Sequence, residues 1–400
     1  MFRDKSIVTS IMFHTVGLEN HPWVWSHISE SLKSFEEKLQ ALNRFKYHSV
    51  FWSELYDYMN GDKKLPDNSI FLTFDDGYLD NWVYVYPLLK KYKLKGTIFV
   101  NPEFVDPGDS LRLTLEDVWA GKCGMNELQV PGFLNWSEMK AMEASGYVDI
   151  QSHSLTHTWH YKSPKLVDYH HYTNEPYRYP WLFWNAKPER KPFYLNENQN
   201  DFVEQGMPIL EHEKSLVVKR FYPNENAMNN VKTYIENQNI DEFYKKDCWL
   251  SDVQSYVLEK YGKDGIPGYY ETAEARLERI YHELLDSKQR LEKGLNKDVD
   301  FICWPGGGND KEVHEQAVKA GYKSWTLGSQ DQSNYRNMSN TNPQYIKRIG
   351  SSNKIYFRGN FVGEGSWFYM MLNIWAHQNS KFYFNVLRTY KLIRWVLRLK

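Results

Sequence analysis

Two short motifs bring together residue types that can bind a metal ion and activate a water molecule. The first, TFDDG at residues 73–77, places two adjacent carboxylates directly after an apolar run. Side chains alternate along an extended chain, so Asp75 and Asp76 point in different directions, and one can bind a metal while the other acts as a general base. Asp and Gly also favour turns, so this motif taken alone is better explained as a plain turn.

The second motif, HSLTH at residues 153–157, offers two imidazoles. His153 and His157 are four residues apart, so on a helical segment they lie on one face and can share a metal ion. Taken alone, the pair also fits two exposed or hydrogen-bonded histidines. Both motifs follow apolar runs that are expected to be strands. Together they supply an Asp-His-His set with one open position, as catalytic zinc sites require.

The elements that must position these motifs are short apolar strands that alternate with helices. Strands are expected at 7–13, 70–74, 96–100, 148–151, 301–304, 324–327 and 345–349. Helices are expected at 34–46, 82–92, 137–145, 271–295 and 312–320. This alternation predicts a parallel sheet or barrel with helices outside and with functional residues at the carboxyl ends of the strands.

Capping signals mark several of the expected helix ends. Ser34 with Glu37 forms a capping-box pattern at the start of the first helix. Pro87 suits the first position of a helix, and Gly146 suits the C-terminal cap of the helix that ends at Ser145.

Between about residues 158 and 270 the alternation stops, and the chain becomes rich in Tyr, Trp, Asn and Pro. This stretch is too aromatic for a disordered linker, so we expect a structured insertion that folds over one end of the barrel. The whole sequence has 15 Trp, 29 Tyr and 21 Phe, which fits either large core residues or rings that stack on sugars.

The segment after Glu364 contains no acidic residue. Its basic residues are Lys381, Arg388, Lys391, Arg394, Arg398 and Lys400. In a helix, residues 388, 391, 394 and 398 form a basic stripe. This pattern fits a helix packed on the domain with its basic side in solvent, or a helix that lies on an anionic membrane.

The bulk composition narrows the class of protein. A net charge of −1 over 400 residues gives no sign of attraction to nucleic acid, so no nucleic-acid partner is expected. The three cysteines, Cys123, Cys248 and Cys303, are too few and too far apart for a disulfide framework, which favours a reducing compartment. Neither a signal peptide nor a membrane-spanning helix is expected. We therefore expect a cytoplasmic protein. If the C-terminal tail lies on a membrane, we expect peripheral contact at the inner face of that membrane.

At these motifs the sequence resembles the polysaccharide deacetylases, carbohydrate esterase family 4, which share the homology domain of the nodulation chitooligosaccharide deacetylase. The flanking segments FHTV, LPDNSIFLTFDDGYLDN, YPLLKKY and KGTIFV match as well. The resemblance covers roughly the first 157 residues and then 277–349. It implies an α/β fold, a distorted (β/α) barrel of about seven parallel strands built from residues 1–157 and 271–355. Residues 158–270 would then cap the active-site face, and residues 356–400 would form a basic amphipathic C-terminal extension.

The resemblance also implies roles for single residues. Asp75 would be the catalytic base, and Asp76, His153 and His157 would hold one divalent metal ion. Zinc is the expected metal, with cobalt, nickel or manganese as alternatives. A third motif, FICWPGG at residues 301–307, would place the Gly306 N–H at the oxyanion. We assign Trp304, Pro305 and His14 to substrate binding.

The sequence departs from the family pattern in its third motif. Cys303 stands where many members have an arginine that pairs with the base, and Gly306 replaces the usual aromatic residue. We hypothesise that Arg348 takes over as the partner of Asp75. A later Leu-x-His, which supplies the general acid, has no clear match. The histidines His14, His170, His171 and His212 are candidates for that role, and none is assigned.

Three functions fit these residues. The first is a metal-dependent hydrolase that removes N-acetyl or other N-acyl groups from an amino sugar in a polysaccharide, oligosaccharide or glycolipid precursor, such as a bacterial cell-surface glycan. The second is a non-catalytic carbohydrate-binding protein, favoured by the altered third motif. The third is an O-acetyl esterase or a non-sugar amidase, because the metal, water and base do not recognise the leaving atom.

Overall fold

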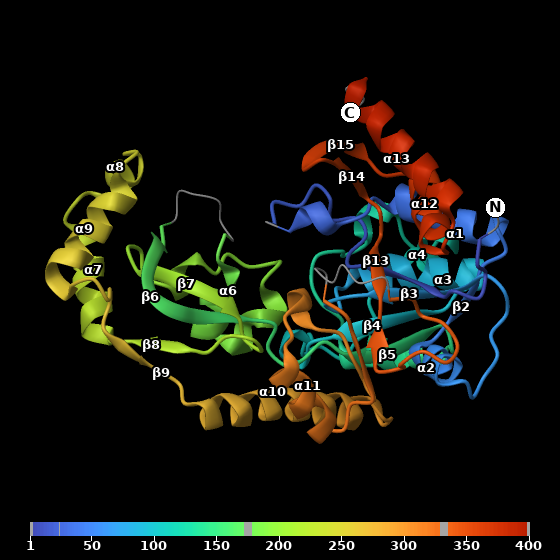
Figure 1. The fold of residues 1–400 in the computed structure, drawn as a ribbon, viewed down its shortest axis with the longest axis horizontal. Coiled ribbons are helices and arrows are strands. Elements are labelled where there is room, and N and C mark those ends of the chain that lie inside the picture. Colours follow the sequence, from blue (N-terminus) through green and yellow to red (C-terminus); the bar gives the residue numbers. More distant parts are fainter. Residues whose placement is uncertain (1–2, 24, 172–177, 329–334, 398–400) are drawn as a thin grey trace. The chain divides into compact units, whose positions relative to one another are not determined.

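The computed structural model describes residues 3–23, 25–171, 178–328 and 335–397. The chain divides into two compact units (Figure 1). The first consists of residues 1–154, 287–307 and 322–400, and the second of residues 155–286 and 308–321. Each unit is described by itself below.

A parallel sheet forms the centre of the first unit. Its strands are β1 (Thr9–Phe13), β2 (His48–Val50), β3 (Ser69–Phe74), β4 (Gly96–Val100), β5 (Val148–Ser152), β10 (Phe301–Ile302), β11 (Ser324–Thr326), β12 (Tyr345–Ile346) and β13 (Arg348–Gly350). The order is β12-β11-β10-β5-β4-β3-β1-β13, and β2 also pairs with β3. Every one of these pairings is parallel. The α/β fold predicted from the alternation is confirmed.

The two edges of this sheet are consecutive in the chain. β12 pairs with β11 at one edge and β13 pairs with β1 at the other, yet only Lys347 separates them. Because neighbouring Cα atoms are about 3.8 Å apart, a single intervening residue brings the edges together. The segment 345–350, of which 345–349 is predicted as one strand, thus bends the sheet round into a ring without a continuous hydrogen-bond ladder. With β12 and β13 taken as one bent strand, the ring has the about seven strands expected of the barrel.

The side chains of the site residues lie on the same face of the strands as a buried apolar cluster of the first unit. Phe71, Phe99, Phe301, Cys303 and Ile346 lie in one buried cluster. Residues two positions further along a strand point to the same face. Thr73 and then Asp75 follow Phe71 in this way, Asn101 follows Phe99, and Arg348 follows Ile346. These side chains therefore point into the space above the cluster. The Trp52 ring stacks on Phe301 within the cluster, with ring centroids 5.1 Å apart.

The helices of the first unit are α1 (Leu32–Arg44), α2 (Trp52–Asn60), α3 (Tyr86–Tyr92), α4 (Leu115–Trp119), α5 (Trp136–Ala144), α12 (Trp367–His377) and α13 (Lys381–Val396). A π-helical turn, η2 (Asn81–Val85), precedes α3, which has Pro87 in its first turn as predicted. The predicted capping box at Ser34 is wrong. The α1 helix begins two residues earlier, because Ser31 caps it by accepting from the Ser34 N–H.

The second unit has its own strands and helices. They are β6 (Trp159–Tyr169), β7 (Pro208–Lys214), β8 (Phe221–Pro223), β9 (Gly268–Tyr270), α6 (Pro180–Ala186), α7 (Glu225–Glu236), α8 (Ile240–Tyr244), α9 (Trp249–Tyr261) and α11 (Lys311–Lys319). The long α10 (Ala273–Leu295) belongs to both units. The aromatic stretch at 158–270 is therefore structured over its described residues. Its predicted capping of the active-site face stays a prediction.

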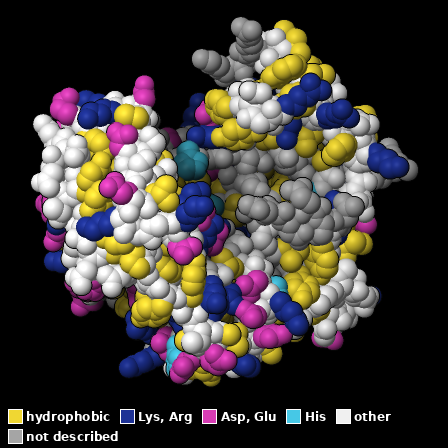
Figure 2. Space-filling view, turned by 60° about the vertical axis from the view of Figure 1, so that its left-hand side comes forward, with side chains coloured by type: hydrophobic (Ala, Val, Ile, Leu, Met, Phe, Trp, Pro, Cys, Tyr) yellow, Lys and Arg dark blue, Asp and Glu magenta, His cyan; other side chains and the backbone are white. Residues whose placement is uncertain are grey.

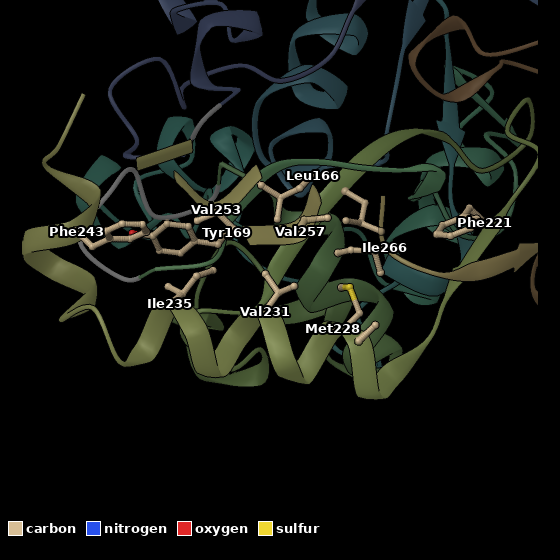
Figure 3. Close-up of a cluster of buried hydrophobic side chains, with 12 residues drawn as sticks. Leu166, Tyr169, Phe221, Met228, Val231, Ile235, Phe243, Val253, Val257 and Ile266 are labelled. Atoms are coloured by element: carbon tan, nitrogen blue, oxygen red, sulfur yellow. The ribbon is translucent and has the colours of Figure 1, made fainter. Parts of the chain in front are cut away.

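A separate hydrophobic core holds the second unit together (Figure 3). Val231 and Ile235 of α7 pack with Leu210 of β7 and Val253 of α9, and each is fully buried. Burial of these apolar side chains gives the unit a core of its own, as an independent domain needs.

Replacing Leu210 by Ala tests this core. The Leu210 side chain is 0% exposed, so we expect the variant to lose about 2–5 kcal/mol of unfolding free energy. Urea unfolding of the full chain measures the change. Leu258→Ala, on the exposed side of α9, is the matched control and should change stability by less than about 0.5 kcal/mol. Equal stability of the two variants would contradict the packing seen here.

Candidate active site

Asp75 directly follows the carboxyl end of β3. Its side chain is buried and accepts two hydrogen bonds from an arginine. Arg348 donates from Nη1 to Oδ1 at 2.7 Å and from Nη2 to Oδ2 at 3.0 Å. Burial, the largest single effect, raises the pKa of Asp75. The charges of Arg348 and His14 and the hydrogen bonds from Arg348 together outweigh burial and hold that pKa below its usual range. The partner hypothesised for Asp75 is therefore the partner found. Asp75 is kept as a carboxylate, which is the form that accepts a proton.

A left-handed turn sets Asp76 apart from Asp75. Asp76 and Gly77 have φ of 75° and 69°, a region that Gly adopts freely and Asp tolerates. Glycine suits Gly77 for its conformation, and a Cβ there would also make a tight contact of 3.1 Å with the Val100 side chain. The turn leaves the Asp76 side chain beside His153, with Oδ1 3.1 Å from Nε2.

His153 has the hydrogen-bonding arrangement of a metal ligand. Its Nδ1 lies 2.8 Å from the Cys303 carbonyl oxygen, which can only accept, so Nδ1 carries the proton. In the neutral ring, Nε2 then presents its lone pair to the Asp76 carboxylate. The Nε2 lone pair of His153 and Oδ1 of Asp76 are both hydrogen-bond acceptors and lie 3.1 Å apart, so they repel each other unless a proton or a metal cation lies between them. The Asp and His donor set, with a carbonyl holding the far ring nitrogen, suits a divalent metal.

Asn101 is a site residue that the sequence analysis missed. It follows β4 directly, and its side-chain amide donates to the His153 carbonyl and, at 3.2 Å, to the Ser154 carbonyl. Ser154 has a left-handed φ of 59°, so these two bonds hold a bent backbone in place. The one signal that could have pointed to Asn101 is its position directly after a predicted strand, 96–100.

Asn101→Ala should weaken the His153 side of the site. Loss of the amide leaves two buried carbonyls without that donor, which costs about 1–3 kcal/mol, and a loosened metal ligand lowers affinity by about 10–100-fold. Zn²⁺ titration of the purified protein measures the affinity, and urea unfolding measures the stability. Asn126→Ala, at an exposed position, is the control. Unchanged Zn²⁺ affinity in Asn101→Ala would rule out this positioning role.

Cys303 contacts both members of the ion pair. Its Sγ lies 3.5 Å from Oδ2 of Asp75 and accepts from Nη2 of Arg348 at 2.9 Å. Burial raises the pKa of the Cys303 thiol well above its ordinary value, and the charge of Arg348 does not reverse this. Cys303 is therefore a neutral thiol. It fills the position where an arginine was expected, while Arg348 supplies the charge from β13.

The rest of the third motif forms a tight turn. Trp304 and Pro305 are buried, with the Trp304 ring 6.1 Å from that of Trp325, so neither presents an exposed surface. Gly306 is exposed and has a left-handed φ of 55° within the short helical turn η7 (Pro305–Gly307). The substrate-binding roles of Trp304 and Pro305 and the oxyanion role of the Gly306 N–H stay predictions.

His14 lies between Asp75 and a cavity. Its Nε2 is 3.9 Å from Oδ2 of Asp75, and burial lowers the pKa of His14 although the two neighbouring carboxylates oppose this. His14 also lines a cavity of about 330 Å³, together with Ile349, Asn353, Tyr356 and other residues of the same unit. A neutral imidazole at this point can accept a proton from a neighbouring group or from a molecule in the cavity. The substrate-binding role of His14 stays a prediction.

Four other predicted histidines belong to the second unit. His157 makes edge contacts there with Trp159 and Trp184. His170 and His212 bond to the carbonyls of Asn200 and Leu210, and His171 stacks against Tyr244. Their relation to Asp75 is not fixed by the structure. The role of His157 as third metal ligand stays a prediction.

Comparison with known proteins gives a consistent family. The polysaccharide deacetylase family model matches residues 62–201, which contain both motifs. The chain is 29% identical over 147 residues to the Bacillus subtilis protein YxkH, whose name assigns it to the polysaccharide deacetylases. This alignment covers 37% of the chain and 42% of YxkH, so it spans less than half of that relative.

Two solved structures share the fold. One is a de-N-acetylase from Aggregatibacter actinomycetemcomitans, with a TM-score of 0.50, 15% identity, and coverage of 86% of this chain and 94% of that one. The other is the BpsB deacetylase domain from Bordetella bronchiseptica, with a TM-score of 0.51, 15% identity, and coverage of 88% and 97%. At this identity the likeness concerns the fold alone. The family match, together with the motifs inside it, identifies residues 62–201 as a polysaccharide deacetylase domain.

Proposed function

We propose that this protein is a metal-dependent hydrolase that removes N-acetyl groups from an amino sugar. One observation carries the proposal. The carboxylate of Asp75 accepts two hydrogen bonds from Arg348, which keep it ionised. The neighbouring carboxylate, that of Asp76, faces the lone pair of His153. The first group can accept a proton from water, and the second belongs to a donor set that binds a metal ion.

The roles of the residues follow from this arrangement. Asp76, His153 and His157 would hold a divalent ion, with zinc favoured by the imidazole ligands. When bound, such an ion polarises a carbonyl and acidifies water. Asp75 then takes the proton of the attacking water, and Arg348 keeps the carboxylate aligned. The Gly306 N–H donates to the developing oxyanion. His14, whose Nε2 lies 3.9 Å from Oδ2 of Asp75, would relay the proton that Asp75 took from water to the departing amine.

The family supports a glycan substrate, and the names of two similar proteins specify removal of acyl groups. A polysaccharide, an oligosaccharide or a glycolipid precursor fits equally well. The bond cleaved is proposed to be the amide, because the de-N-acetylase from Aggregatibacter actinomycetemcomitans shares the fold. An O-ester or a non-sugar amide is the alternative substrate, and carbohydrate binding without turnover is the alternative function.

Acetate release tests the proposal. The purified protein is incubated with N-acetylated and O-acetylated oligosaccharides, before and after removal of metal by a chelator, and again after Zn²⁺ is restored. Release from the N-acetylated substrates that is lost with the chelator and regained with Zn²⁺ supports the proposal. Release only from O-acetylated substrates would make the protein an esterase. Sugar binding without any acetate release would show a non-catalytic protein.

A further inference from the structure

The outer face of α13 is unusually apolar for the surface of a water-soluble domain. Leu392, Ile393, Trp395 and Val396 are 41%, 49%, 39% and 62% exposed, and Phe382 is 57% exposed. A helix packed on a protein core normally turns such residues inward. Here they occupy the side that faces away from the domain.

The inner face of the same helix carries cations. Arg394 donates from Nε to the Val362 carbonyl at 3.1 Å and stacks over the Tyr390 ring. Lys391 lies 5.6 Å from the centre of the Tyr369 ring. Part of the predicted basic stripe is thus packed against the domain, whereas apolar residues face out. This is the reverse of the arrangement in which the basic side is solvated.

Neighbouring elements of the first unit extend this apolar surface. The hairpin of β14 (Lys354–Phe357) and β15 (Asn360–Glu364) contributes Tyr356 and Phe361, and α12 contributes Phe368. Toward the top of Figure 2, where the C-terminal elements lie, hydrophobic side chains and Lys or Arg side chains stand next to one another. We call this the C-terminal surface. Its members are Tyr356, Phe361, Phe368, Phe382, Phe384, Leu392, Ile393, Trp395, Val396 and Leu397.

The positive charge of this surface favours an anionic partner. Lys381, Arg388 and Arg358 are exposed among the apolar residues, and no acidic residue follows Glu364 in the sequence. A second copy of the chain would set these cations against the same cations, which costs free energy. An anionic bilayer takes up the apolar side chains, and long basic side chains reach its phosphates. None of the described helices is long and apolar enough to cross a bilayer.

We propose that the C-terminal surface docks the protein on an anionic lipid bilayer, with α13 lying in the plane of the interface. Trp395 and the exposed tyrosine and phenylalanine side chains suit the interfacial region, where rings with apolar bodies are favoured. Lys381, Arg388 and Arg358 contribute electrostatic attraction, which adds to the apolar contacts.

Docking has a consequence for the substrate, and this consequence rests on the proposed function. Tyr356 belongs to the C-terminal surface and also lines the cavity that His14 lines. Tyr369, another lining residue, lies under Lys391 and stacks on Tyr390 of α13. The cavity thus extends from the docking surface to a histidine 3.9 Å from the base. We infer that a lipid-linked amino sugar enters from the bilayer through this cavity and is presented to the site on the His14 side.

Vesicle sedimentation tests the docking without reference to activity. The full chain is mixed with vesicles of phosphatidylcholine containing a quarter phosphatidylglycerol, or of phosphatidylcholine alone. We expect binding to the anionic vesicles that weakens with salt. Lys381→Glu with Arg388→Glu should lower partitioning by at least about tenfold, since each cation near such a surface contributes about fivefold. Ile393→Glu with Val396→Glu should abolish it.

Matched variants at other exposed positions serve as controls. Val318→Glu on α11 is as exposed as the α13 residues, and Lys311→Glu reverses an exposed charge. Both should bind vesicles like the wild type. Absence of vesicle binding overturns the proposal. A lipid-free dimer that Ile393→Glu with Val396→Glu dissociates, together with no vesicle binding, would instead identify the surface as a contact between two copies.

The substrate consequence is tested separately. Deacetylation is compared for a soluble N-acetylglucosamine oligosaccharide and for a lipid with an N-acetylglucosamine headgroup in the anionic vesicles. Ile393→Glu with Val396→Glu should lower the second rate at least about tenfold and leave the first unchanged. Equal rates on both substrates in wild type and variant overturn the consequence. If the wild type deacetylates neither substrate, the proposed function is contradicted, and the result of the vesicle-binding experiment is unaffected.

Discussion

Asp75→Asn should lower acetate release by about 10²–10⁴-fold while leaving the bound metal in place. The amide cannot accept the proton of the attacking water, and general-base catalysis contributes about that factor. Asn keeps one oxygen that can accept from Arg348, so the ring of strands should remain folded. Turnover at saturating substrate measures the loss, and elemental analysis of the purified variant measures the metal.

Asp264→Asn, at an exposed position of the second unit, is the control for the chemical change itself and should keep full activity. Loss of metal in Asp75→Asn would place Asp75 among the ligands and not at the base. Full turnover in that variant would remove Asp75 from the reaction altogether.

Arg348→Ala should impair both stability and activity. It leaves the buried Asp75 without its charged partner, and loss of one member of a buried pair costs about 3–5 kcal/mol. The pKa of Asp75 should rise, because the charge of Arg348 is the largest of the effects that lower it. The base is active when deprotonated, so the acid limb of the pH–rate profile should move to higher pH. Urea unfolding and kcat/KM across pH measure the two effects.

Arg348→Lys separates charge from geometry. A lysine keeps the positive charge but cannot bond both carboxylate oxygens in the planar fork of an arginine. We expect a smaller shift of the acid limb than in Arg348→Ala and an intermediate stability. An acid limb at the wild-type pH in the folded Arg348→Ala protein would show that Arg348 does not tune the base.

The sequence was most informative where chemistry and strand pattern coincide. TFDDG and HSLTH each follow an apolar run, and parallel strands place their carboxyl ends at one edge, so the nearness of Asp76 and His153 could be predicted. Arg348 could be proposed as well, because it lies on the last predicted strand. The family resemblance supplied the roles.

Other features depend on contacts that no local pattern encodes. Ser31 and Ser34 are both good capping residues, so residue type alone could not tell that Ser31 caps the helix. The spacing of basic residues along α13 is visible in the sequence, but which side of the helix meets the domain is decided by Tyr369 and Val362. Asn101 was missed because a single amide carries no spacing signal.

The ring of strands determines the stage of protein synthesis at which Asp75 can meet its partner. The strand that bonds to Asp75 is translated 273 residues after it. During synthesis from the N-terminus, the carboxylate therefore lacks the counter-charge of Arg348 until 273 further residues have been translated. The ring of strands and the ion pair of Asp75 thus form at the same stage, when Ile346 pairs with one edge of the sheet and Arg348 with the other.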